Sequence, residues 1–298
     1  MKRIAIIGSG ISGLGAAFAL KDTAHVTLFE ARDRLGGHSC TLDVDYDGTQ
    51  VPVDVGFIVY NALNYPNLIA LFEALGVETQ PSDMSFAVSD PEGYEWASSA
   101  RGFFAQKRNL LDLRFHRFWR AILRFNDTAR GELKGGIMQG MTLGAWLDRH
   151  GFDQTFRENY VLPMAAAIWS TPEKGILDYP AQSFFNFFDN HRLMHRERPK
   201  WRTVCGGSRT YVEAMARVLG DRVRTGTPVQ AVSPFGDRVR VTSDAGSEVF
   251  DDVILACHSD QALALLDPAY EQQRWLLTSV RYRPNRIFLH RDPDLISA

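Results

Sequence analysis

The sequence has few cysteines and no long apolar segment. Its three cysteines, Cys40, Cys205 and Cys257, are widely spaced and form no CxxC pair. This pattern indicates neither a disulfide framework nor a structural zinc site. No segment approaches the ~20 apolar residues that span a bilayer, and the apolar run after Met1-Lys2-Arg3 is too short for a signal peptide. We therefore expect a cytoplasmic protein, or one peripheral to the inner face of the membrane.

A strong charge of one sign is also absent. The net charge is −2 at pH 7, and 23% of the 298 residues are charged. Because no RNA- or DNA-binding motif accompanies this balance, we expect no nucleic-acid partner. The apolar fraction of 45% is ordinary for a globular protein. The length suffices for one large domain or two interleaved domains, and it gives no indication of the oligomeric state.

The glycine-rich turn after the first apolar segment is the most informative feature. Residues 4–7 predict a strand, an amphipathic segment follows the turn, and residues 25–29 predict a second strand. This order is typical of a nucleotide-binding βαβ unit. In such a unit Gly8 permits the tight turn, Gly10 lets the backbone approach a pyrophosphate, and Gly13, with Gly15 behind it, lets the helix lie close to the strand.

The ends of the two predicted elements supply the ligand contacts. Gly10, Ile11, Ser12 and Gly13 occupy the helix N-terminus, where free N–H groups and the helix dipole favour phosphate. Glu30 follows the second strand, seventeen residues after Gly13, and is placed to accept hydrogen bonds from a ribose diol.

A basic turn with two adjacent glycines follows Glu30. Its sequence is Ala31-Arg32-Asp33-Arg34-Leu35-Gly36-Gly37-His38, where a nicotinamide-binding domain would enter another crossover helix. Arg34 can neutralise a pyrophosphate, whereas Arg32 fits a solvated turn equally well. Gly36 and Gly37 let the main chain pass beside a bulky cofactor without Cβ clashes.

This run, EAxxRxGG, resembles the superfamily of flavin-containing amine oxidases, phytoene desaturases and protoporphyrinogen oxidases. The Gly-Gly-His run and residues 256–263, ACHSDQAL, are similar to bacterial "predicted NAD/FAD-binding" amine-oxidase-like proteins. The resemblance implies FAD as the cofactor and a discontinuous binding site. It also implies that the strand around Asp54, Gly56 and Phe57 returns to the flavin, and that the backbone at Val229 faces the adenine. The predicted site residues are Gly8, Gly10, Ile11, Ser12, Gly13, Glu30, Ala31, Arg34, Gly36, Gly37, His38, Asp54, Gly56, Phe57 and Val229.

The predicted fold is α/β. It comprises a Rossmann-like FAD-binding domain, with a parallel sheet and an antiparallel excursion, and an inserted, mostly helical α+β substrate domain. We assign residues 1–80 and 202–263 to the first domain, and residues 81–201 and 264–298 to the second. Strand candidates at 228–233, 237–242 and 248–256 belong to the first domain, as do a hairpin around Asp47-Gly48 and a short helix over residues 66–75 that Gly76 closes. The last of them ends in an apolar run typical of a strand buried on both faces.

The second predicted domain is rich in aromatic and basic residues, and Thr142 and Thr171 predict helix N-caps within it. Phe184, Phe185, Phe187 and Phe188 form either core or the lining of a cavity. Arg114, Arg117, Arg120 and Arg124 recur at helical spacing, as in a solvated face or in a helix that docks on an anionic membrane. The apolar side chains that are expected to turn away from them, toward the core, are Phe115, Phe118, Trp119 and Ile122. His191 and His195 have a metal-ligand spacing but lack a third ligand, so we expect no metal.

The resemblance implies an FAD-dependent oxidoreductase. It would transfer hydride from a C–H bond of an apolar, fatty-acyl or amine substrate to flavin N5, with acyl-chain desaturation as the favoured specific reaction. One alternative is a flavin-dependent isomerase of the sugar-nucleotide mutase kind, and another is a truncated nucleotide-binding protein without catalysis. The superfamily carries a further C-terminal glycine-rich flavin motif, which this sequence lacks before Ala298. We therefore expect either a truncated chain or final cofactor contacts from elsewhere.

Overall fold

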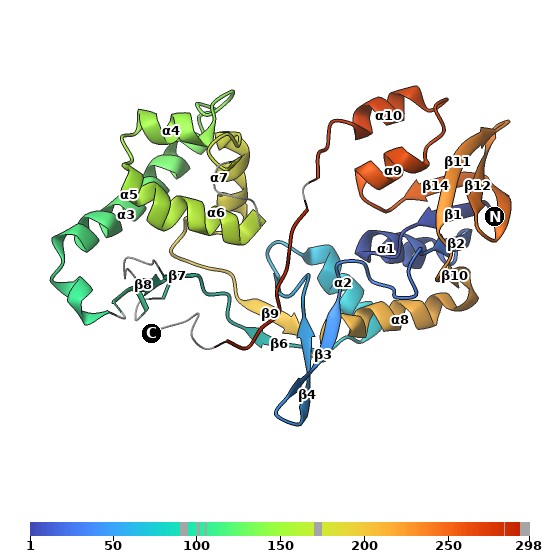
Figure 1. The fold of residues 1–298 in the computed structure, drawn as a ribbon, viewed down its shortest axis with the longest axis horizontal. Helices are drawn as coiled ribbons and strands as arrows, with labels where there is room; N and C mark the ends of the chain where they lie inside the picture. The colour runs from blue at the N-terminus through green and yellow to red at the C-terminus, as the bar shows by residue number, and fades with distance from the viewer. Residues whose placement is uncertain (90–94, 100–101, 105, 170–174, 283, 293–298) are drawn as a thin grey trace. The chain divides into compact units, whose positions relative to one another are not determined.

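The computed structural model describes residues 1–89, 95–99, 102–104, 106–169, 175–282 and 284–292. The chain forms two compact units (Figure 1). The first unit comprises Met1–Tyr60, Pro66–Pro81 and Arg202–Leu289, and the second comprises Asn61–Tyr65, Ser82–Trp201 and His290–Ala298. The predicted α/β class is confirmed, because the first unit contains a parallel sheet and the second is mostly helical.

A four-stranded parallel sheet in the order β10-β2-β1-β14 is the centre of the first unit. Ala5 and Ile7 of β1 pack with Phe29 against apolar side chains of the antiparallel sheet β11-β12-β13. Helix α1 packs against α8. These elements are β1 (Arg3–Ile7), α1 (Ile11–Leu20), β2 (His25–Phe29), α8 (Arg209–Leu219), η5 (Gly220–Arg222), β10 (Val223–Arg224), β11 (Val229–Phe235), β12 (Arg238–Ser243), β13 (Gly246–Phe250) and β14 (Asp252–Leu255).

The remaining elements of this part of the chain are short. Strands β3 (Thr41–Tyr46) and β4 (Thr49–Asp54) form the predicted hairpin around Asp47-Gly48. A further sheet has the order β5-β9-β6, and two helices follow β14. Their bounds are β5 (Tyr60–Asn61), α2 (Pro66–Leu75), β6 (Thr79–Ser82), β9 (Trp201–Val204), α9 (Ser259–Leu265) and α10 (Glu271–Leu277).

The second unit is built around an aromatic core. Phe115, Phe125, Trp146 and Phe185 are fully buried and belong to one hydrophobic cluster. Its elements are β7 (Ala87–Ser89), β8 (Glu95–Ala97), η1 (Gly102–Phe104), η2 (Lys107–Leu110), α3 (Leu113–Leu133), α4 (Leu143–Arg149), α5 (Gln154–Phe156), the π-helix η3 (Arg157–Val161), α6 (Leu162–Trp169) and α7 (Ala181–Asn190).

The predicted strand 248–256 is wrong in its continuity. The chain breaks at Asp251, whose carboxylate accepts a 2.7 Å hydrogen bond from the backbone N–H of Arg3, so β13 and β14 enter different sheets. The expectation that this strand is buried on both faces is also wrong, because Val253–Leu255 are half-buried on β14, at the edge of the described sheet.

The predicted boundary at residue 263 also differs from the structure. Residues 264–289 lie in the first unit, not in the second. The N–H of Asp267 donates to the carbonyl of Val232 on β11. The Arg274 guanidinium donates to the carbonyl of Leu263 at 2.9 Å. Because these bonds run to the sheet and to α9, the segment packs with the nucleotide-type fold.

Candidate cofactor-binding site

The first glycine turn has the geometry that a tight strand-to-helix connection needs. Gly8 adopts a left-handed φ of 102°, and its N–H donates to the carbonyl of Phe29 at 2.8 Å. A Cβ at Gly13 would lie 1.8 Å from the carbonyl oxygen of Gly8. A Cβ at Gly15 would meet nothing within 4 Å. The close approach of α1 to the turn therefore depends on Gly13, and the expected contribution of Gly15 is wrong.

Gly10 lies at an open helix N-terminus. Its φ of −62° is accessible to any residue, and a Cβ on it would meet nothing within 4 Å. No side chain caps α1, and Ile11 and Ser12 are exposed at its first positions. The first N–H groups of a helix have no partner inside the helix. The free donors and the empty space above Gly10 together suit an anionic ligand.

Glu30 lies beside the glycine turn. Its carboxylate accepts hydrogen bonds from Ser9 N at 2.9 Å, Ser9 Oγ at 2.6 Å and Arg32 N at 2.9 Å. Burial raises the pKa of this carboxyl, but the bonds from Ser9 Oγ, Arg32 N and Ser9 N outweigh burial and hold its pKa below the usual range. Glu30 is therefore an ionised acceptor that points toward the turn.

The double-glycine turn contacts the helix N-terminus directly. The N–H of Gly36 donates to the carbonyl of Ser9 at 3.0 Å, and Gly36 and Gly10 form a parallel bridge. A Cβ at Gly37 would lie 3.0 Å from the Cα of Gly10. Arg34 donates to the carbonyls of Leu35, Ser39 and Gly37, the last at 2.8 Å. In this structure Arg34 thus supports the turn, and a contact with pyrophosphate stays a prediction.

The strand around Asp54 joins the same region through its backbone. The N–H of Phe57 donates to the carbonyl of His38 at 3.1 Å, and a Cβ at Gly56 would lie 1.9 Å from that oxygen. Gly56 is therefore required by the approach of His38. The Asp54 carboxylate accepts bonds from Thr41 Oγ1 and from Ser208 N and Oγ, which fix the hairpin to the start of α8.

The segment just before β11 is hydrogen-bonded to Glu30 and Arg32. The N–H of Thr227 donates to the carbonyl of Glu30 at 2.8 Å, and that of Gly226 donates to Arg32 O at 3.0 Å. Val229 follows two residues later and is half-buried. The structure thus brings the first glycine turn, Glu30, Ala31, the double glycine and the segment before Val229 together.

The sequence patterns did not predict the roles of three polar side chains of this region, namely Ser9, His258 and Tyr282. Ser9 holds Glu30. His258 stacks on His38 with ring centroids 5.4 Å apart, and on Tyr282 with centroids 4.4 Å apart. The position of His258, three residues after the last residue of β14, was a usable signal, because ligands bind at the carboxyl ends of parallel strands. The neighbouring Cys257 is half-buried, and this burial raises the pKa of its thiol.

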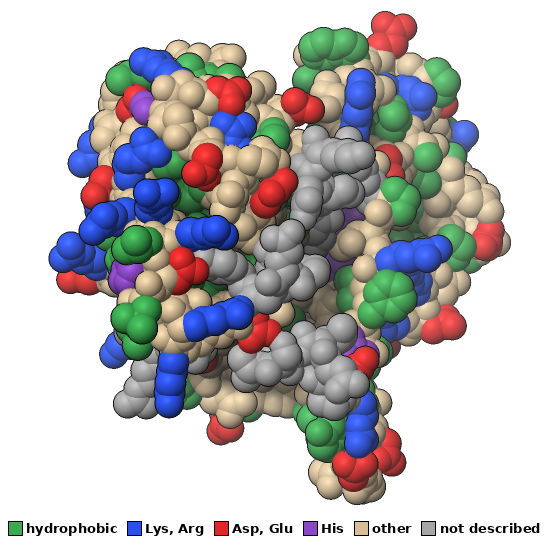
Figure 2. All heavy atoms as spheres, turned by 60° about the vertical axis from the view of Figure 1, so that its left-hand side comes forward, with side chains coloured by type: hydrophobic (Ala, Val, Ile, Leu, Met, Phe, Trp, Pro, Cys, Tyr) green, Lys and Arg blue, Asp and Glu red, His purple; other side chains and the backbone are tan. Residues whose placement is uncertain are grey.

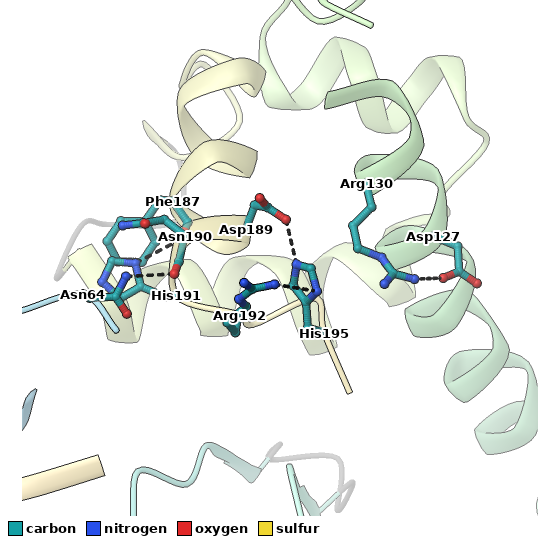
Figure 3. Close-up of polar contacts among 9 residues, drawn as sticks. All are labelled: Asn64, Asp127, Arg130, Phe187, Asp189, Asn190, His191, Arg192 and His195. Carbon is teal, nitrogen blue, oxygen red and sulfur yellow. Dashed lines mark hydrogen bonds and ion pairs between the residues drawn. The ribbon is translucent and has the colours of Figure 1, made fainter. Parts of the chain in front are cut away.

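The second unit contains the other predicted candidates. Phe184, Phe185 and Phe188 are buried in the aromatic core, and Phe187 packs against it, so the core reading holds. Helix α7 ends at Asn190, which leaves His191 as its C-cap and His195 outside it (Figure 3). Within the described ranges no three His, Cys, Asp or Glu side chains form a metal-binding group. The predicted N-cap Thr171 lies outside the described residues.

Similarity to known proteins assigns the family. A model of the flavin containing amine oxidoreductase family matches residues 11–285, and the chain belongs to this family. AofH of Mycobacterium tuberculosis, whose name places it among the flavin-containing monoamine oxidases, is 26% identical over 285 residues and is matched over 61% of its length by 90% of this chain. Coproporphyrinogen III oxidase of Mycobacterium bovis is 41% identical over 76 residues, 24% of this chain and 16% of that enzyme.

Solved structures confirm the fold. Cyclohexylamine oxidase from Brevibacterium oxydans aligns with a TM-score of 0.73 at 22% identity, covering 93% of this chain and 63% of that one. A putrescine oxidase bound to putrescine aligns with a TM-score of 0.72 at 22% identity and the same coverage. The chain thus spans less than two thirds of the length of these relatives. The resemblance drawn from the sequence is confirmed, and flavin is the cofactor that the family description names.

Proposed function

We propose that the first unit binds FAD and that the protein is an FAD-dependent oxidoreductase. The observation that carries the proposal is that the fold itself gives no reason for a glycine at position 10. Neither its φ of −62° nor its neighbours require glycine, since a Cβ there meets only open space. A ligand that approaches the backbone closely supplies the reason for glycine. Uncapped N–H groups at the same point supply the matching donors.

The residues around this space have distinct roles in the proposal. The N-terminus of α1 holds the pyrophosphate, and Glu30, kept ionised by Ser9 and Arg32, accepts from the ribose hydroxyls. The backbone before Val229 lies beside Glu30 and faces the adenine. Gly36, Gly37 and His38 border the path toward the flavin ring, with Arg34 fixing their turn. Flavin, when bound, would accept a hydride from a C–H bond of the substrate.

An amine is the substrate class that the comparisons favour. AofH is named as a monoamine oxidase, and the aligned structures are of putrescine and cyclohexylamine oxidases. A fatty-acyl substrate is the second candidate, because a 37% identical segment belongs to a protein named as a zeta-carotene desaturase, which would act on an apolar chain. The arginines at helical spacing on α3 give the mutase alternative little support. One of them, Arg124, is already hydrogen-bonded to the carbonyl of His150 at 2.8 Å and lies over the Phe152 ring.

We also propose that the start of α3 docks on an anionic membrane. Leu110, Leu111 and Leu113 are 52%, 89% and 76% exposed. Exposed basic side chains surround them in sequence, namely Lys107, Arg108, Arg114, Arg117 and Arg120. Asp112, which caps α3 by accepting from Arg114 N, is the one acid between residues 106 and 126. Each basic residue near an anionic surface contributes about 1 kcal/mol. No helix in the described ranges is long and apolar enough to cross a bilayer.

Absorbance of the purified protein tests the enzymatic proposal. We expect bound flavin whose absorbance bleaches under anaerobic conditions when putrescine or cyclohexylamine is added. If only a fatty-acyl substrate bleaches the flavin absorbance, the reaction is desaturation of an acyl chain and not oxidation of an amine. Bound flavin that no substrate of either class reduces would favour the nucleotide-binding protein without catalysis.

A further inference from the structure

Arginine side chains line a pocket that the proposed flavin chemistry does not use. The pocket has a volume of about 500 Å³ and lies entirely within the second unit. This volume is in the range of small-molecule sites, roughly 300–1,000 Å³. Its lining residues are Leu63, Arg130, Arg192, His195, Arg196, Glu197, Arg198 and Pro199.

Two acids hold part of this lining in place. Asp127 pairs with Arg130 one turn away on α3, and Asp189 at the end of α7 contacts Nε2 of His195 at 2.7 Å (Figure 3). Nη1 of Arg192 lies 3.4 Å from the other ring nitrogen of His195. Arg192 itself has a left-handed φ of 57°, which turns the chain back after α7. These contacts fix cations from α3 and from the segment after α7.

The positive charge of the lining is incompletely neutralised. Among the described residues that line the pocket, four are arginines and Glu197 is the one carboxylate. Arg196 and Arg198 are exposed and form no ion pair with any residue in the described part of the chain. The buried Nε of Arg130 likewise has no hydrogen-bond partner among the described residues. Like charges held together in this way favour a multivalent anion that neutralises them.

We propose that this pocket binds a phosphate-bearing ligand through Arg130, Arg192, Arg196 and Arg198. Guanidinium groups donate paired hydrogen bonds that match phosphate oxygens, and several of them suit a di- or polyanion better than a single carboxylate. The same chemistry belongs to a free phosphorylated molecule and to a lipid headgroup. Lys and Arg side chains are spread over the face of the second unit that Figure 2 turns forward, which would attract either anion.

Titration of the protein with inorganic pyrophosphate by calorimetry tests the site. The variant carries Arg196→Gln and Arg198→Gln, both exposed positions that leave the aromatic core intact. Its control carries Arg149→Gln and Arg238→Gln, which are exposed and change the net charge equally. We expect saturable binding that weakens about tenfold or more in the variant and stays unchanged in the control.

Vesicles distinguish the two sources of phosphate. The same proteins are sedimented with phosphatidylcholine vesicles that contain or lack phosphatidylglycerol. Pyrophosphate binding lost in the variant with unchanged sedimentation assigns the pocket to a free ligand, and loss of sedimentation on anionic vesicles assigns it to a headgroup. The proposal is overturned if the variant matches the control in both measurements, for then any pyrophosphate bound lies elsewhere, including at the phosphate turn of the first unit.

Discussion

Different kinds of interaction shape the interior of each of the two units. At the candidate site of the first unit, glycine positions and backbone hydrogen bonds set the geometry, as between Gly8 and Phe29 or Gly36 and Ser9. In the second unit, aromatic side chains interlock instead, and the Phe125 ring contacts the rings of Trp146 and Phe185. We infer that the candidate site of the first unit is sensitive to the addition of a single Cβ atom. The second unit is instead sensitive to the loss of side-chain volume from its aromatic core.

The largest effect is expected from Gly13→Ala. The added Cβ would lie 1.8 Å from the carbonyl of Gly8, so the turn and α1 must separate. We expect a loss of more than about 4 kcal/mol in the free energy of unfolding, a magnitude that single mutations seldom reach. Urea unfolding measures it. The matched control is Gly15→Ala, which meets no atom within 4 Å and should stabilise α1 by about 0.5–1 kcal/mol. Equal behaviour of the two variants would contradict the steric argument.

Truncation of the aromatic core should come next. Phe125 is 0% exposed, and Phe125→Ala should cost about 3–5 kcal/mol through lost burial and the cavity left behind. Tryptophan fluorescence during urea unfolding reports this change, since Trp146 contacts the ring. Flavin binding by the variant should persist under conditions where it remains folded. A small effect would mean that the second unit tolerates lost volume better than its packing indicates.

Glu30 offers a smaller and pH-dependent effect. Glu30→Ala should weaken FAD binding by about 1.5–3 kcal/mol, the range for hydrogen bonds to a charged group. Since the folded pKa of Glu30 lies below its usual range, its stabilising contribution is present above the unfolded pKa and is lost as pH falls through the folded pKa. Unfolding measured from neutral to acidic pH should show this loss in the unaltered protein and a weaker one in the variant. If the stability of the two proteins depends on pH in the same way, Glu30 does not make this contribution.

Membrane docking should respond to the exposed leucines of the second unit. Changing Leu111 and Leu113 to serine should reduce sedimentation with phosphatidylglycerol vesicles by about tenfold, since less apolar surface enters the bilayer. Both side chains lie outside the core, at 89% and 76% exposure, so folding should be unaffected. Leu42→Ser, at a 44% exposed position of the first unit, is the control. Vesicle binding that is insensitive to both changes would place any contact elsewhere.

The contrast between the units also explains what could be predicted from the sequence. Helix α2 has the predicted bounds because Pro66 begins it and Gly76, with a φ of 66°, ends it. The Asp47-Gly48 hairpin is confirmed for the same reason: both residues adopt a positive φ. Residues with special backbone geometry mark such boundaries locally. The double glycine, which the sequence placed beside a cofactor, lies against Gly10, and its proximity to the cofactor stays a prediction.

Contacts between distant residues could not be predicted in this way. The break between β13 and β14 depends on a hydrogen bond from Arg3 to Asp251, 248 residues away. The placement of α10 depends on bonds from Arg274 to the carbonyl of Leu263, near the end of α9, and to that of Leu266, just after it. Trp119 was expected among the buried faces of α3 but is 38% exposed, because periodicity alone does not determine the edge of an apolar stripe.

The central claim is that the open space above Gly10 receives the pyrophosphate of FAD. The most direct test is a fluorescence titration of FAD with the unaltered protein, with Gly10→Val and with Gly15→Ala. Both positions leave room for a Cβ, so both variants should fold. We predict that Gly10→Val loses FAD binding while Gly15→Ala keeps it. Full affinity in Gly10→Val would contradict the claim.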